Sequence, residues 1–286
     1  MKRIAGLVAL TFSLWISAGA QSLQVPATVK ANTALSVPTS GRGDAILYLA
    51  GPASFSKRTV KLGAPIEVAP EELHSAGQWL MTVKSGQGAE TATFQVLPAD
   101  TGKISFIVRP SRVPVAVAGG ISGVAYLLDN YQNLVIEPRK VSFRLSIEQG
   151  PSESHVVESQ YGVAWIKLDS GPKQGAAQFV AAADDVSENR VVQEVASHGC
   201  NLHITARPAS SKDTIMVATD PVRDCGGNPI PDGTIVTFTQ TQNGLVTTVD
   251  APIKQGVAQV ELAAVPSVIS AASGVIMGNE LRWGRP

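Results

Sequence analysis

The chain has 286 residues, with 23 basic and 23 acidic side chains and a formal net charge of zero. Its basic residues are not clustered, which excludes a nucleic-acid-binding surface. Twenty-six glycines and 18 prolines over this length predict two or three turn-rich domains of about 100 residues each.

Residues 1–20 have the three-part pattern of a secretory signal peptide. Lys2 and Arg3 precede an uncharged stretch over residues 4–16, and Ala18-Gly19-Ala20 offers small side chains for cleavage before Gln21. The stretch is shorter than the about 20 residues that span a bilayer. Cleavage would remove two of the 23 basic residues and no acidic one, leaving a net charge of −2. We therefore expect an exported chain, periplasmic or extracellular, with no membrane-spanning segment.

Residues 21–100 are expected to form a β-sandwich module of their own. Two runs alternate with period two on either side of a glycine-rich turn at 85–88. In the first run, Trp79, Met81 and Val83 alternate with Leu80, Thr82 and Lys84, and in the second, Ala92, Phe94 and Val96 alternate with Thr93 and Gln95. Alternation with period two on both sides of such a turn predicts a β-hairpin with Trp79 on its core face. A proline- and glycine-containing linker at 97–102 ends the module.

The rest of the chain contains an internal repeat. Five residues recur at identical spacing about 95 positions later. The first copy and its second-copy equivalents are Asp129 and Asp224, Asn133 and Asn228, Val135 and Ile230, Val141 and Val236, and Phe143 and Phe238. A repeat of this length indicates two copies of one small antiparallel sandwich. We assign residues 101–196 and 197–286 to these two domains.

The repeated Asp and Asn precede strands whose apolar residues alternate with polar ones. Val141 and Phe143 in one copy, and Val236 and Phe238 in the other, define the core face, because a one-residue slip would expose all of them. Asp and Asn at such positions shape turns by bonding nearby backbone amides. Calcium binding is the alternative, but its six or more oxygen ligands are not suggested by any dense acidic run, and no cofactor or metal is expected.

The last domain resembles a known family. Residues Asn228-Pro229-Ile230-Pro231-Asp232-Gly233-Thr234-Ile235-Val236-Thr237-Phe238, followed by Gly256-Val257-Ala258, are similar to the bacterial immunoglobulin-like domains of the invasin and intimin type. Residues 101–196 match less well, with Glu137-Pro138-Arg139 in place of the Pro-Asp-Gly turn, and residues 21–100 do not match. The resemblance implies an all-β chain of tandem immunoglobulin-like Greek-key β-sandwiches, used as spacers or adhesive modules and without catalytic residues.

Cys200 and Cys225 are the only cysteines. An even pair in an exported protein predicts a disulfide, here between the start of the last domain's first strand and the end of its second. A zinc site that adds His198 and His203 has suitable ligand types, but the spacing matches no common zinc motif.

No arrangement of residues typical of catalysis is found, so we predict a nonenzymatic chain. Gly120-Ile121-Ser122-Gly123 lacks the glycine spacing of a nucleophile elbow. Arg42-Gly43-Asp44 matches the tripeptide that integrins read on exposed loops. The more economical interpretation is a glycine-rich turn that leads into a strand, and integrin recognition is the alternative.

Trp165 and Lys167 are the candidate binding surface. Residues 162–168 align with residues 256–262, where Gln259 and Glu261 must face solvent. Trp165 occupies the position of Gln259 and should therefore face outward, which predicts a contact with another module or a partner.

These features predict a noncatalytic structural or adhesive protein of the bacterial cell envelope, whose partner is a protein or a glycan. A glycan- or small-ligand-binding module is the alternative, and an accessory subunit of an enzyme is a more distant one.

Overall fold

The computed structural model describes residues 23–147 and 152–284. The predicted signal peptide lies outside this described part. The chain divides into two compact units. The first contains the described residues up to Asp100 together with Asp129–Asn133, and the second contains Thr101–Leu128 and the described residues from Leu134 onward.

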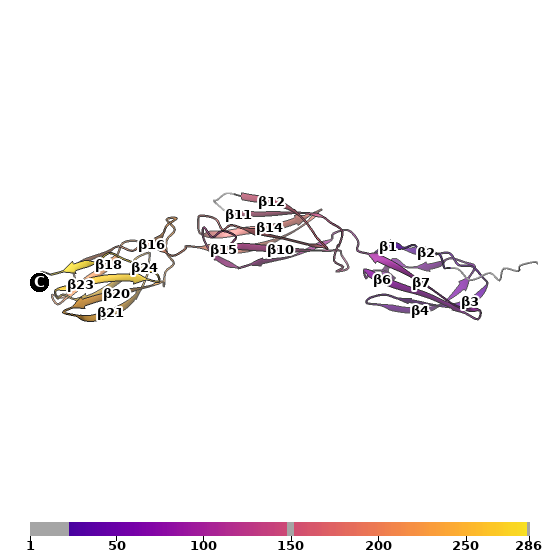
Figure 1. Cartoon of the computed structure of the whole chain (residues 1–286), viewed down its shortest axis with the longest axis horizontal. Helices are drawn as coiled ribbons and strands as arrows, with labels where there is room; N and C mark the ends of the chain where they lie inside the picture. The colour runs from indigo at the N-terminus through magenta and orange to yellow at the C-terminus, as the bar shows by residue number, and fades with distance from the viewer. Residues whose placement is uncertain (1–22, 148–151, 285–286) are drawn as a thin grey trace, which may run out of the picture. The chain divides into compact units, whose positions relative to one another are not determined.

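The first unit has one five-stranded and one two-stranded sheet (Figure 1). The larger sheet has the order β1-β7-β6-β3-β4, comprising Thr28–Lys30, Gly88–Leu97, Gly77–Ser85, Gly43–Ala50 and Phe55–Leu62. The smaller sheet pairs β2 with β5, Leu35–Val37 with Ile66–Val68, and a 3-10 turn follows at Pro70–Glu72.

The hairpin predicted in this unit is confirmed. In β6 and β7, Trp79 pairs with Phe94 and Met81 pairs with Ala92. Trp79, Met81 and Val83 are all buried, so the alternating residues face the core as the period-two pattern predicts. Gly51 lies against the Trp79 ring so closely that a Cβ there would come within 2.3 Å of it. A side chain at position 51 would therefore displace the tryptophan.

The second unit contains two hydrophobic cores, and we call the elements around them the second and third sandwiches. The second sandwich has a five-stranded sheet, β12-β11-β14-β15-β9, comprising Ser152–Glu158, Lys140–Ile147, Gly175–Ala183, Val186–Val195 and Arg112–Pro114. Its other sheet is β13-β10-β8, comprising Val163–Leu168, Ile121–Leu128 and Lys103–Arg109.

Aromatic rings join the two sheets of the second sandwich. Phe106 on β8 meets Phe179 on β14 in a T-shaped contact, with ring centroids 5.0 Å apart, and Phe143 on β11 lies 5.9 Å from Phe106. All three side chains are buried. Gly123 on β10 makes room for them, because a Cβ there would come within 2.7 Å of the Phe179 ring.

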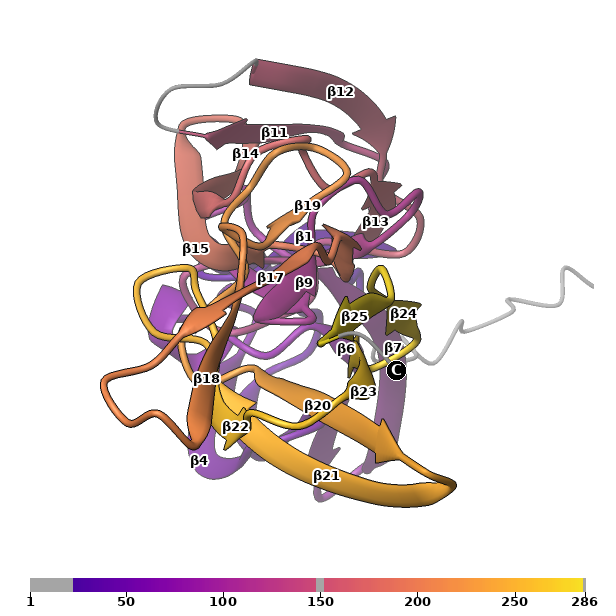
Figure 2. The ribbon, with the colours of Figure 1, turned by 90° about the vertical axis from the view of Figure 1, so that its left-hand side faces the viewer.

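The third sandwich also has sheets on both sides of one core. Its first sheets are β17-β18-β22, comprising Ile204–Pro208, Thr214–Thr219 and Gln259–Ala263, and the pair β16-β19, comprising Gly199–Asn201 and Arg223–Asp224. The other sheet is β21-β20-β23-β24 with β25 beside β23, comprising Leu245–Pro252, Ile235–Gln242, Ser267–Ser273, Ile276–Met277 and Leu281–Trp283. Figure 2 shows β20 and β21 side by side, as their antiparallel register requires.

Both copies of the repeat bury the residues expected to face inward. Val141 and Phe143 on β11, and Val236 and Phe238 on β20, are fully buried. The sheets of the sandwiches bury one face and leave the other to solvent, which is what alternation along each strand reflects. The fold is therefore all-β, with tandem immunoglobulin-like sandwiches.

One backbone turn occurs in both units without sequence similarity. The Asn32 amide donates to the Leu73 carbonyl, and the Ala116 amide donates to the Gly171 carbonyl. Asn32 and Ala116 both have φ of +57°, a conformation that few residues other than glycine and asparagine adopt readily. Leu73 and Gly171 are thus structurally equivalent.

Candidate functional site

Trp165 lies on an exposed apolar sheet face of the second sandwich. Its side chain on β13 is 63% exposed, whereas the neighbouring Ala164 is buried. Val124 on β10 pairs with Trp165 on one side and with Ile107 on the other, which is 46% exposed. We define the outer face as Ile107, Val124, Tyr126, Val163 and Trp165. This row joins three strands, so the tryptophan is one end of an apolar stripe.

Positive charge borders the outer face on one side. Lys167 on β13 pairs with Ser122, and Ser122 pairs in turn with Arg109 on β8. Lys167 and Arg109 are both exposed. An exposed apolar stripe bordered by cations suits a partner surface that is apolar at its centre and acidic at its rim.

The Arg42-Gly43-Asp44 tripeptide is exposed, but two of its residues belong to a strand. Gly43 and Asp44 pair with Leu62 and Lys61 on β4. Gly43 has a φ of +98°, a conformation that glycine adopts without strain. Integrin recognition of this tripeptide stays the alternative interpretation.

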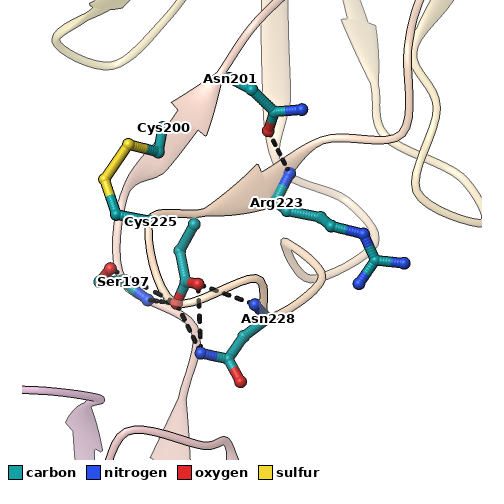
Figure 3. The surroundings of a disulfide bond; sticks show 7 residues. Ser197, Cys200, Asn201, Arg223, Cys225 and Asn228 are labelled. Carbon is teal, nitrogen blue, oxygen red and sulfur yellow. Dashed lines mark hydrogen bonds between the residues drawn. A yellow bond between two sulfur atoms is a disulfide. The ribbon is translucent and has the colours of Figure 1, made fainter.

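The third sandwich contains a disulfide between Cys200 and Cys225 (Figure 3), whose Cα atoms are 4.9 Å apart. The strands that position it are those expected, although each is interrupted. β17 pairs with β18 antiparallel, and β16 pairs with β19 in the same register further along, so Cys200 and Cys225 lie where the start of the first strand meets the end of the second. Because the bond uses both sulfurs, it leaves no thiolate for a zinc site with His198 and His203.

The repeated Asp and Asn form a polar network that extends beyond the turn predicted from the sequence. Asp224 is buried and accepts hydrogen bonds from the Asn228 amide at 2.8 Å and from the Ser197 amide at 3.1 Å. Burial tends to raise the pKa of Asp224. The bonds from the Asn228 side chain and from the amides of Asn228, Ser197 and Gly226 outweigh that effect and lower it.

Asn228 also reaches a distant loop. Its side-chain oxygen accepts from the Gln174 amide at 3.1 Å, and its nitrogen donates to the Pro172 carbonyl at 3.1 Å. The turn-forming role predicted from the sequence is therefore present, together with bonds that only the folded chain shows. Nothing in the local sequence indicates them, because the partners lie more than 50 positions away.

Glu194 on β15 is a buried carboxylate of the second sandwich. Its Oε1 accepts from the Gly171 amide at 2.9 Å, while its buried Oε2 has no hydrogen-bond partner among the described residues. Burial raises the pKa of Glu194, and the bond from Gly171 opposes this only in part. The first unit has the buried Leu73 at the position equivalent to Gly171. A Cβ at Gly171 would come within 2.3 Å of Ile147 Cδ1 and within 2.9 Å of Glu194 Oε2, so this position has no room for a side chain.

We expect Glu194→Gln to stabilise the second sandwich at neutral pH by on the order of 1 kcal/mol, because it removes a buried charge and keeps the acceptor for Gly171. Because the pKa of Glu194 is higher in the folded state than its usual 4.5, the free energy of unfolding of the wild type falls as the pH rises from 4.5 to the folded-state pKa and then stays constant. Glutamine does not titrate, so the difference in the free energy of unfolding between Glu194→Gln and wild type should increase over this pH range. Urea unfolding at a series of pH values from 4 to 8 measures this difference. Glu261→Gln, the same change at an exposed site, is the control. A difference that does not vary with pH would contradict the assignment.

Two further findings concern metal binding and membrane-spanning helices. No group of three or more His, Cys, Asp or Glu side chains in residues 23–147 and 152–284 is arranged to hold a metal ion. Within the same ranges, no helix has the length and apolar character needed to cross a membrane.

The structure resembles solved bacterial adhesin domains. The Escherichia coli adhesin FdeC matches with a TM-score of 0.59 at 14% identity, covering 94% of this chain and 100% of that one. Invasin, a bacterial integrin-binding protein, matches with a TM-score of 0.52 at 12% identity, covering 90% of this chain. Yersinia pseudotuberculosis InvD matches with a TM-score of 0.50 at 13% identity, covering 92% of this chain and 97% of that one.

The chain spans 58% of the length of the invasin chain that it matches. No protein-family model matches the sequence, and no curated protein matches it. At these identities the likeness concerns the fold, which is that of the bacterial immunoglobulin-like domains found in these adhesins. The resemblance expected from the sequence is thereby confirmed.

Proposed function

We propose that the chain is an exported, noncatalytic protein of the bacterial cell envelope that acts as a structural and adhesive interaction module. The outer face of the second sandwich carries this proposal, because Trp165 is 63% exposed within a continuous apolar stripe. Single exposed apolar residues are common on protein surfaces, whereas a contiguous apolar stripe that crosses three strands is typical of an interaction site.

Three other observations support this proposal. The disulfide is of the kind that persists in oxidising compartments. The N-terminal twenty residues have the signal-peptide pattern. The fold is shared with FdeC, invasin and InvD. A fold does not assign a function by itself, so the binding surface must be tested directly.

Trp165→Gln is the most direct test, because the aligned position in the third sandwich carries Gln259 on an equally outward position. We expect the variant to fold normally and to weaken binding by about tenfold or more, as for a central aromatic anchor. The measurement is adhesion of beads coated with the full mature chain to cultured epithelial cells and to immobilised glycans.

Leu245→Gln is the matched control, since Leu245 is an apolar residue of the same unit with 76% exposure and lies away from the outer face. Equal adhesion by wild type and Trp165→Gln would contradict the proposal. Loss of binding to glycans alone would favour the alternative, a glycan-binding module. Binding to cells that weakens with added salt would agree with the charged border formed by Lys167 and Arg109.

A further inference from the structure

The two Asp–Asn pairs of the repeat make the same set of hydrogen bonds. In the second unit, Asp224 accepts from the Asn228 amide and from Ser197, and the Asn228 side chain bonds Pro172 and Gln174. We call Asp224 with Asn228 the Asp–Asn latch, and we use the same name for the pair described next.

In the first unit, Asp129 accepts from the Asn133 amide at 2.8 Å and from the Ala99 amide at 3.0 Å. The Asn133 side chain accepts from the Ala76 amide at 2.8 Å and donates to the His74 carbonyl at 2.7 Å. Each bond has its counterpart in the second unit. The partners of Asn133 and Asn228 are offset by 98 positions in both cases, from His74 to Pro172 and from Ala76 to Gln174.

The latch bonds a distant loop only through the backbone of that loop. The groups contacted are a carbonyl and an amide two residues further on, and the side chains there differ completely: His74 and Ala76 in one unit, Pro172 and Gln174 in the other. The linker partner in both units is a backbone amide, from Ala99 or Ser197, and in the second unit the Ser197 hydroxyl also donates to Asp224 at 3.4 Å. The bonds that both latches share therefore impose no requirement on the side chains of the loop and linker.

Asparagine suits this position because its amide donates and accepts at once. The Asn228 nitrogen lies 3.0 Å from an Asp224 carboxylate oxygen as well as 3.1 Å from the Pro172 carbonyl, so both acceptors share one donor group. Aspartate in its place would set a second negative charge against the carboxylate. The lowered pKa of Asp224 agrees with a carboxylate that is held charged by these donors.

We propose that the Asp–Asn latch of the second unit is a connector: a side-chain pair that recognises the backbone of the loop and linker before it and so holds the second and third sandwiches in one arrangement. In the second unit it holds the second sandwich's loop 172–174 and the linker at Ser197 to the third sandwich. The partner that it fits is another sandwich offering a carbonyl and an amide two residues apart, whatever the side chains. Asn228 is thus a positioning residue and not part of the outer face.

The test uses the full mature chain and two substitutions at the same contact. Asn228→Ala removes the latch side chain, whereas Gln174→Ala changes a residue whose backbone alone takes part. Hydrogen exchange reports the Gln174 amide, and electron–electron distance measurements between spin labels at Gln178 and Thr247, both exposed, report the arrangement of the two sandwiches.

We expect Asn228→Ala to speed exchange of the Gln174 amide by about tenfold or more, since a hydrogen bond of this kind contributes about that factor, and to broaden the label distances. Exchange of the Phe238 amide in the core of the third sandwich should stay unchanged. Gln174→Ala should behave as wild type in both measurements. Unchanged Gln174 exchange and unchanged distances in Asn228→Ala would overturn the proposal, and so would an equal effect of Gln174→Ala.

Should Asn228→Ala fail to fold, Asn133→Ala gives the same test in the first unit, with the Ala76 amide as the reporter. Acceleration of Ala76 exchange supports the proposal, and unchanged exchange overturns it. Adhesion through the outer face is a separate readout, so either result leaves the test of Trp165 independent.

Discussion

Phe179→Ala should lower the free energy of unfolding of the second sandwich by about 3–5 kcal/mol, the range for removing a buried phenylalanine. Phe179 is fully buried and its ring contacts Phe106 and Phe143, with centroids 5.0 and 6.1 Å away. These rings come from both sheets, so the cavity would open at the centre of the sandwich. Hydrogen exchange of the β14 amides measures the loss for this sandwich separately from the others.

Phe55→Ala is the matched control, because the Phe55 ring is 65% exposed and packs only at the surface near Tyr48. Its effect on stability should stay within about 0.5 kcal/mol. A loss below about 1 kcal/mol for Phe179→Ala would show that the second sandwich does not depend on its aromatic core.

Replacing Cys200 and Cys225 together by serine should destabilise the third sandwich by about 3 kcal/mol. The bond joins residues that are 25 positions apart, and breaking it restores that much chain freedom to the unfolded state. Both cysteines are exposed, so serine costs little packing. The measurement is hydrogen exchange of the β20 amides in the double variant and in wild type.

Reduction of the wild-type chain with dithiothreitol should produce the same loss and should leave the double variant unaffected. Because Asp224 directly precedes Cys225, we also expect the Ser197 amide to exchange faster in the double variant. Equal stability of oxidised wild type and double variant would contradict a stabilising role for the bond.

Local patterns were sufficient to predict the strands and their inward faces. Val141, Phe143, Val236 and Phe238 are buried as alternation predicts, and Trp165 faces solvent as its alignment with Gln259 indicates. Alternation is reliable here because side chains on a strand point to opposite faces in turn, and only one face is covered.

Residues 23–100 share one backbone turn with the second sandwich without sharing its sequence motif. They lack the repeated motif, yet Asn32 and Ala116 adopt the same positive φ and donate to equivalent carbonyls. Backbone groups make these bonds, so different side chains support one turn. Motif comparison cannot detect a similarity of this kind.

The sequence by itself determined the all-β class, the internal repeat, the paired cysteines and the side chains that face inward, because each depends on spacing along the chain. Only the tertiary structure decided what surrounds the functional candidates. It placed Val124 and Ile107 beside Trp165, the unpaired Glu194 oxygen in the core, and the Asn228 side chain against the backbone of residues 172–174. Strand pairing and the connections between sheets bring these neighbours together from distant parts of the chain. Such contacts leave no periodic pattern in the sequence.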